Sequence, residues 1–219
     1  MYVKINGLKL YYEKQGSGQP FLLVHGNGED HRIFDRAVSD LSQYYTVYAL
    51  DSRGHGKSDP VPTLSYSEMA EDVAEFIRVL ELEKPLFCGF SDGGIVGLIA
   101  AVRWPDLFSK LVVAGANMTP SGIKQPVQGI TKLQNFFFPD AKLDLMLTQP
   151  NLTVRQLSSI RVPTLVLAGE YDVIRKEETK RIARSIPGAK CLILPGQTHT
   201  SYVIHSDKLF AAMSAFLRD

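Results

Sequence analysis

The sequence predicts an α/β protein built on a doubly wound, mostly parallel sheet of about eight strands. Short continuous apolar runs, typical of strands buried on both faces, recur along the chain. Amphipathic helical patterns lie between several of these runs, which favours parallel strands joined by helices. The first two strand patterns are instead joined by Asn6 and Gly7, a pair that predicts an antiparallel hairpin at the start of the chain.

The predicted strands follow one another along most of the chain. The hairpin strands cover residues 2–5 and 8–14. The remaining strands are predicted at the apolar runs 21–24, 45–50, 86–90, 111–116, 164–168 and 190–194. Cys88 and Cys191 each lie within such a run. We therefore expect both to be small buried side chains rather than a disulfide or metal ligands.

Four helices are predicted, over residues 65–82, 93–103, 175–186 and 206–217. The first begins at Ser65, a candidate N-cap with Glu68 three residues later. Apolar residues recur in it every three or four positions, the spacing of a face packed on a core. We interpret this face as core rather than as a cofactor site.

One long stretch, residues 117–160, breaks the alternation of strands and helices. It has no buried-strand pattern and only two short helical patterns, at 128–137 and 141–147. It is much longer than the roughly 4 to 6 residues of an ordinary connection. We therefore predict a core domain formed by residues 1–116 and 161–219, with residues 117–160 inserted between two strands as a small helical cap.

Composition and charge narrow the range of partners. Lys and Arg number 24 against 23 Asp and Glu, a net charge of +1 that provides no field to attract nucleic acid or anionic lipid. No apolar run approaches the roughly 20 residues that cross a bilayer, and no secretion signal is visible at the start. We expect a small, largely neutral substrate, no nucleic-acid or membrane partner, and a cytoplasmic location; the oligomeric state is not predicted.

The run 86–90 leads into Gly89-Phe90-Ser91-Asp92-Gly93, with a glycine two residues on either side of the serine. This G-x-S-x-G pattern lets a strand turn sharply into a helix and holds the serine in a strained conformation with its hydroxyl exposed. A plain strand-to-helix turn has the same glycines. The motif alone therefore leaves a nucleophile and a simple turn as alternatives.

A serine hydroxyl becomes a nucleophile when a base takes its proton and an acid orients that base. The strand 164–168 is followed by Glu170 and Asp172, and the strand 190–194 by His199. These loops meet at the carboxyl edge of a parallel sheet, where ligands bind. Glu170 stays open as a rival acid and His205 as a rival base, and Asp172 has a plain alternative as a helix cap.

On these motifs the sequence resembles the α/β-hydrolase fold superfamily over nearly the whole chain. The segments that carry the resemblance are the loop His25-Gly26-Asn27-Gly28, the D-x-R-G-H-G-x-S pattern from Asp51 to Ser58, the serine turn, Asp172 and His199. It implies that Ser91 is the nucleophile, His199 the base and Asp172 the acid. It also implies an oxyanion hole made by the backbone N–H groups of Asn27 and Asp92, with no metal and no organic cofactor.

The resemblance implies an esterase-like serine hydrolase that cleaves an acyl substrate through an acyl-enzyme on Ser91. A cofactor-free perhydrolase or haloperoxidase, a carbon-carbon hydrolase or an acyltransferase would use the same triad, and a ligand receptor or signalling protein would keep the same pocket. The short cap suggests an open or partly formed pocket, and the Asp92 carboxylate is expected to point away from the oxyanion. Candidate pocket residues are Phe90, Met118, Phe136, Phe137 and Phe138, although the three consecutive phenylalanines would equally anchor the cap to the body.

Overall fold

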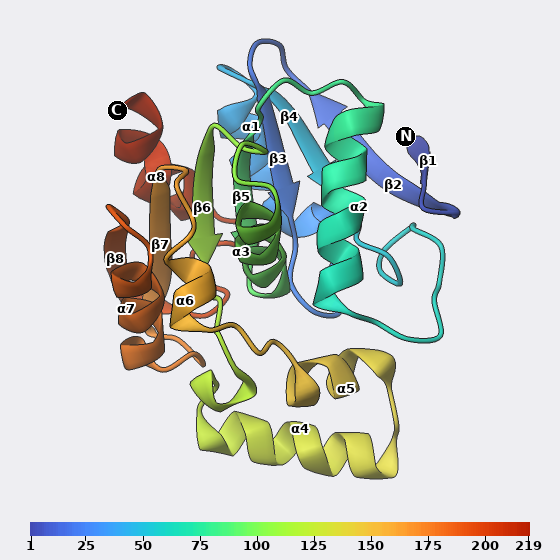
Figure 1. Ribbon diagram of the computed structural model, residues 1–219, viewed down its shortest axis with the longest axis vertical. Helices are drawn as coiled ribbons and strands as arrows, with labels where there is room; N and C mark the ends of the chain where they lie inside the picture. Colours follow the sequence, from blue (N-terminus) through green and yellow to red (C-terminus); the bar gives the residue numbers. More distant parts are fainter.

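The computed structural model describes residues 1–219 and contains one eight-stranded sheet in the order β1-β2-β4-β3-β5-β6-β7-β8 (Figure 1). The strands are β1 Tyr2–Ile5, β2 Leu8–Gln15, β3 Pro20–Val24, β4 Thr46–Leu50, β5 Leu86–Phe90, β6 Lys110–Ala114, β7 Thr164–Tyr171 and β8 Lys190–Thr198. β2 is antiparallel to β1 and β4, and the six strands from β3 to β8 are mutually parallel. The predicted fold class is confirmed.

Eight α-helices and two 3₁₀ turns connect and cover the strands. They are η1 His31–Phe34, α1 Asp35–Leu41, α2 Tyr66–Val79, α3 Asp92–Arg103, η2 Pro120–Gly122, α4 Gln125–Phe137, α5 Ala141–Thr148, α6 Val154–Leu157, α7 Lys176–Ser185 and α8 Lys208–Arg218. Ser65 caps α2, accepting a hydrogen bond from the Ser67 N–H at 3.2 Å, as its position before an apolar pattern predicts. None of these helices is both long enough and apolar enough to span a membrane.

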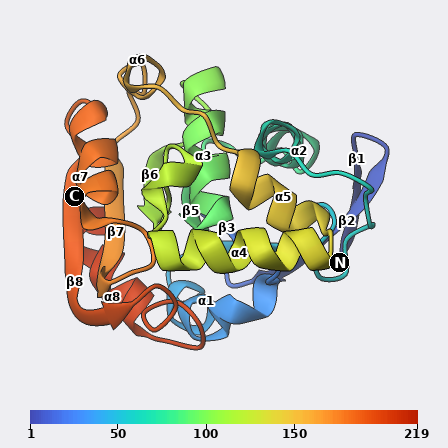
Figure 2. The same ribbon diagram turned by 90° about the horizontal axis from the view of Figure 1, so that it is seen from below.

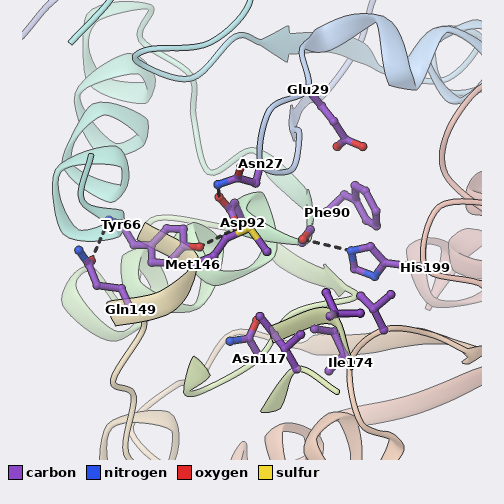
Figure 3. Close-up of a pocket in the computed structure, with 14 residues that line it drawn as sticks. Asn27, Glu29, Tyr66, Phe90, Asp92, Asn117, Met146, Gln149, Ile174 and His199 are labelled. Atoms are coloured by element: carbon purple, nitrogen blue, oxygen red, sulfur yellow. Dashed lines mark hydrogen bonds between the residues drawn. The ribbon is translucent and has the colours of Figure 1, made fainter. Parts of the chain in front are cut away.

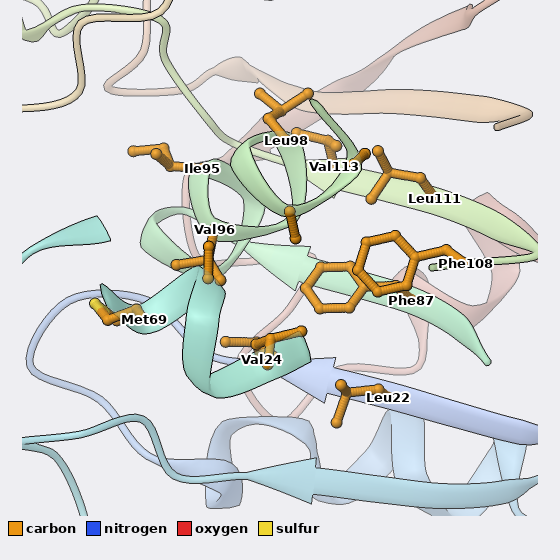
Figure 4. Packing of buried hydrophobic residues seen from close by; sticks show 14 of the residues in the cluster. Leu22, Val24, Met69, Phe87, Ile95, Val96, Leu98, Phe108, Leu111 and Val113 are labelled. Carbon is orange, nitrogen blue, oxygen red and sulfur yellow. The ribbon is translucent and has the colours of Figure 1, made fainter. Parts of the chain in front are cut away.

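Alternating side chains of the strands pack into two hydrophobic cores, one on each face of the sheet. In β3, Phe21 and Leu23 belong to a cluster of 21 buried residues under α1 and α8, whereas Leu22 and Val24 belong to a cluster of 36 under α2, α3 and α7. Figure 4 shows the larger core between the sheet and α3. Since each fully buried Leu, Val or Phe contributes roughly 1.5 to 3 kcal/mol, these two layers fix the sheet that carries the site.

The outermost strand, β8, departs from the prediction. Cys191 is exposed and Leu192 is 37% exposed. β8 pairs only with β7, and its other edge has no neighbouring strand. An edge strand is half-covered even when its sequence is apolar, so the prediction of a buried Cys191 is wrong. Cys88 in the central β5 is fully buried, as expected, and burial raises the pKa of its thiol to about 12.

The parallel strands point their carboxyl ends toward α4 and α5, which lie below them in Figure 1. Seen from below, these two helices run across this edge of the sheet (Figure 2). Residues 117–160 add no strand to the sheet, in line with the break in the sequence pattern. We call α4 and α5 the cap helices. The short α6 packs instead on α3 and α7, and Leu157 within it is fully buried in the larger core.

Candidate active site

Ser91 occupies a strained turn between β5 and α3. Its backbone angles are φ 51° and ψ −113°, a conformation that residues other than glycine rarely adopt and that costs on the order of 1 to 3 kcal/mol. The flanking glycines allow the turn because backbones meet there. A Cβ on Gly89 would lie 2.1 Å from the Gly93 carbonyl oxygen, and one on Gly93 would lie 2.0 Å from the Val24 carbonyl oxygen. The local sequence therefore permits the turn that presents the hydroxyl.

Three side chains from separate loops form a continuous hydrogen-bonded chain. Nε2 of His199 lies 3.2 Å from Oγ of Ser91, and its Nδ1 lies 2.6 Å from Oδ1 of Asp172. Asp172 is 2% exposed, and its carboxylate also accepts backbone N–H groups from Gly169 at 3.2 Å and Ile174 at 2.9 Å. The carboxylate is therefore fixed before it meets the imidazole.

The rival acid Glu170 and the rival base His205 lie away from this hydrogen-bonded series. Glu170 is exposed, and its carboxylate accepts the N–H of Gly196 at 2.9 Å. His205 is exposed and pairs with Asp35 at 2.9 Å. Of the acids and histidines weighed in the sequence, the structure brings only Asp172 and His199 to Ser91.

The His199 ring is held by its surroundings as well as by Asp172. The Phe90 ring lies against it, with the ring centres 4.8 Å apart. Close to both rings, Gly115 adopts φ +63°, and a Cβ at that position would come within 2.8 Å of the imidazole Cε1 and 3.4 Å of the Phe90 ring. The loop after β6 therefore needs a glycine to let His199 reach the serine.

The backbones of Asn27 and Asp92 lie beside Ser91, from the β3 loop and the first turn of α3. As the first residue of α3, Asp92 has an N–H with no partner inside the helix. The Asn27 N–H donates to no acceptor of the protein. The Gly93 N–H donates to the His25 carbonyl at 3.0 Å and joins the two segments. Both N–H groups are therefore available to an anionic ligand atom.

The Asp92 carboxylate is buried beside these groups. It accepts the Tyr66 hydroxyl at 2.7 Å and the side-chain amide of Asn27 at 2.9 Å (Figure 3). Burial raises its pKa from 3.8 to about 6, against the lowering effect of the two hydrogen bonds. This carboxyl is therefore held by a tyrosine and an amide, without a cationic partner.

A cavity of about 180 Å³ opens over Ser91. Its lining combines polar side chains on the sheet side with apolar ones from the cap and the Asp172 loop: Asn27, Glu29, Tyr66, Phe90, Ser91, Asp92, Asn117, Ile123, Val127, Met146, Gln149, Val173, Ile174 and His199. Phe90 is the one predicted pocket residue among them.

The predictions for Met118 and the three consecutive phenylalanines are wrong. Met118 is fully buried in the larger core, and its neighbour Asn117 lines the cavity instead. Phe136, Phe137 and Phe138 are 78%, 64% and 78% exposed. They neither line the cavity nor anchor the cap to the body.

Several lining residues were not predicted. Glu29 directly follows the glycine loop that ends at Gly28, a position that could have pointed to it. Its carboxylate accepts the Gly26 N–H at 3.0 Å, and burial raises its pKa. Tyr66 and Gln149 carry no such signal, because they come from segments 83 residues apart that meet through a 3.3 Å hydrogen bond from the Tyr66 N–H to Gln149 Oε1.

The other buried histidines serve local structure. His25 Nε2 accepts the Ser52 N–H at 3.0 Å, and complete burial lowers the pKa of His25 to about 4. Asp30, His31 and Asp51 are close enough together to hold a metal ion. Their groups are already engaged, since Asp51 accepts the backbone N–H and ring Nδ1 of His31, both at 2.7 Å, and Asp30 pairs with Arg32.

Comparison with known proteins agrees with the observed fold. A family model described as alpha/beta hydrolase fold matches residues 19–145. The human protein named serine hydrolase BPHL is 25% identical over 250 residues, covering 99% of this chain and 85% of that protein. Among solved structures, a thermophilic esterase from Thermogutta terrifontis has a TM-score of 0.84 at 24% identity, covering 100% of this chain and 98% of its own. The enol-lactonase from Burkholderia xenovorans LB400 has a TM-score of 0.83 at 20% identity and covers 100% of both chains.

Proposed function

The chain belongs to the α/β-hydrolase fold family, and on that premise we propose that it is a serine hydrolase that cleaves a small carboxylic ester or a related acyl compound. The observation that carries the proposal is the hydrogen-bonded series from Asp172 through His199 to Ser91. The name of the human relative, serine hydrolase, supports the same class.

In the proposed reaction Ser91 is the nucleophile. The Nδ1–H of His199 donates to Asp172, which leaves the Nε2 lone pair facing the serine hydroxyl. His199 then takes the hydroxyl proton as Oγ attacks the acyl carbon, and Asp172 stabilises the imidazolium that forms. The same imidazolium returns its proton to the leaving alcohol, and an acyl-enzyme on Ser91 remains.

The negative charge of the tetrahedral intermediate needs donors placed in advance. We assign this role to the backbone N–H groups of Asn27 and Asp92. The α3 N-terminus adds a partial positive charge at the same point. His199 next activates a water molecule, whose attack releases the acid and regenerates Ser91.

We further propose that residues 117–160 form a cap domain on a core made of residues 1–116 and 161–219. In support, α4, α5 and the η2 region supply Ile123, Val127 and Met146 to the cavity wall opposite the sheet. With α6 packed on the core, the cap would be attached at both its ends. The cap would then set which acyl groups reach Ser91.

A serine-directed fluorophosphonate probe tests the nucleophile. We expect the wild type to be labelled and to hydrolyse p-nitrophenyl acetate, and Ser91→Ala to lose both properties, with at least about a 1000-fold drop in turnover. Ser39→Ala, at an exposed serine of α1, is the matched control and should behave as the wild type. Labelling that persists in a folded Ser91→Ala variant would refute the assignment.

A further inference from the structure

The outer face of α4 exposes an apolar stripe. Ile130, Leu133, Phe136, Phe137 and Phe138 are between 59% and 78% exposed. We call these five residues the α4 stripe. Assuming roughly 200 Å² for a whole side chain of this size, they expose on the order of 700 Å² of apolar surface, more than the largest patch on a typical monomer.

The stripe lies on the side of α4 that faces away from the protein. The inward side consists of Val127, Gln128, Thr131 and Asn135, of which Val127 lines the cavity and Thr131 is 6% exposed. At 3.6 residues per turn these positions point opposite to Ile130, Leu133 and Phe137. α4 therefore turns its polar side inward and its apolar side to solvent, the reverse of an ordinary surface helix.

We propose that the α4 stripe binds the same stripe of a second copy of this chain, which makes the protein a homodimer joined through its caps. The exposed apolar area of the α4 stripe is close to the roughly 800 Å² that each partner contributes to a standard protein–protein interface. A two-fold contact also requires a surface that complements itself. Ile130, Leu133 and Phe137 have the i, i+3, i+7 spacing of a helix-pairing seam, which meets this requirement.

Two antiparallel α4 helices fit this seam in one register. Leu133 lies near the middle of the stripe, so it meets its own counterpart at the two-fold axis, and Ile130, three residues before it, lies opposite Phe136 of the second copy. The one charged side chain of α4, Lys132, lies off the seam, so no like charges oppose each other. A lipid surface fits less well, because interfacial helices oppose their apolar face with a lysine-rich or arginine-rich one, whereas here that side is uncharged and packed on the protein.

Mass measurement in solution tests the proposal without reference to catalysis. Light scattering or sedimentation between about 1 and 100 µM should give twice the 24.3 kDa of one chain at the upper concentrations. Leu133→Asp, which places two carboxylates at the axis, should weaken association by at least about 100-fold. Gln125→Asp, at an exposed position off the seam, is the matched control and should leave the dimer intact.

Oxidative cross-linking tests the register. In a Cys191→Ser background, which removes the exposed thiol, Leu133→Cys should form a disulfide-linked dimer, and Gln125→Cys, about 12 Å along the helix, should not. A wild type that stays at the mass of one chain at every concentration would overturn the proposal, and so would a dimer that Leu133→Asp leaves unchanged. A monomer that instead cosediments with phosphatidylcholine vesicles through α4 would assign the stripe to lipid and also overturn it.

Discussion

Two adjacent side chains at the serine turn line the same cavity but differ in their partners. The Ser91 hydroxyl lies beside His199, whereas Asp92 is 3% exposed and its carboxylate is hydrogen-bonded to Tyr66 and Asn27. Removing a carboxylate from water favours its protonated form. The pKa of Asp92 accordingly rises from 3.8 to about 6, so an ionised Asp92 is a cost to the folded protein near neutral pH.

This cost predicts how the free energy of unfolding depends on pH. Below pH 3.8 Asp92 is protonated in both the folded and the unfolded chain and has no effect. As pH rises toward 6 only the unfolded chain loses this proton, so the folded state is progressively disfavoured; above pH 6 the penalty is constant, at about 3 kcal/mol. The difference in unfolding free energy between Asp92→Asn and the wild type should therefore shift in favour of the variant by up to that amount between about pH 4 and 7.

Urea unfolding at several pH values measures this difference. Taking the difference between two proteins removes the contribution of His25, whose lowered pKa acts in the opposite direction and reduces stability as pH falls below 6.5 toward about 4. The Ser39→Ala substitution changes no titratable group, so its unfolding free energy should differ from that of the wild type by the same amount at every pH. A constant difference for Asp92→Asn as well would contradict the assigned burial cost.

The residues that meet at the site differ in how far the sequence predicts them. Ser91, Asp172 and His199 each follow an apolar strand, and a parallel sheet brings strand ends together, so local patterns placed them among a few candidates and the family resemblance selected them over Glu170 and His205. The surroundings of Asp92 depend on hydrogen-bond partners 26 and 65 residues away in the chain. No spacing rule connects those positions, so the buried state of its carboxylate could not be predicted.

At the scale of elements, the entry to the cap is tied to the loop that carries Asp172. The Lys124 N–H donates to the Val173 carbonyl at 2.9 Å, and the Arg175 N–H to the Gly122 carbonyl at 2.8 Å. Beside them, Oε1 of the buried Glu178 in α7 accepts the Met118 N–H at 2.8 Å. These contacts hold the start of residues 117–160 against the acid of the proposed triad.

We predict that Glu178→Ala destabilises the protein by about 1 to 3 kcal/mol, because the buried Met118 N–H loses its acceptor. Glu178→Gln keeps a carbonyl oxygen that can accept the Met118 N–H, so this variant should lose much less unfolding free energy. Urea unfolding measures both, and Glu177→Ala, at the exposed neighbouring position in the same first turn, controls for the interaction with the helix dipole. Equal losses in the alanine and glutamine variants would show that the hydrogen bond is not the cause.

Elements with a strong periodic pattern were predicted within a few residues, and the exceptions have physical causes. α1 was not predicted; it is seven residues long and has no side-chain hydrogen bond at its N-cap, so both usual signals of a helix start are weak. The exposure of Cys191 follows from the place of β8 at the sheet edge. The pattern of a strand shows its apolar character but not how many neighbours it has.

At the scale of the whole molecule, sheet and cap together define a small chamber. The cavity has a volume of about 180 Å³, well above the roughly 10 to 15 Å³ that one water molecule needs. It is also below the roughly 300 Å³ at which drug-sized pockets begin. The cap helices are well placed to limit the length of the acyl chain, because Met146 of α5 and Val127 of α4 form part of the wall.

We therefore predict that kcat/KM for p-nitrophenyl acetate or butyrate exceeds that for the octanoate by at least about 10-fold, since a longer chain overfills the cavity at a cost of about 1.4 kcal/mol or more. Met146→Ala opens the wall and should narrow this ratio by raising the octanoate rate. Leu133→Ala, on the outer face of α4, removes a side chain of similar size that lies outside the cavity and should leave the ratio unchanged. A wild type that accepts octanoate as readily as acetate would mean that the cap moves aside during turnover, and the cavity volume would then not govern selectivity.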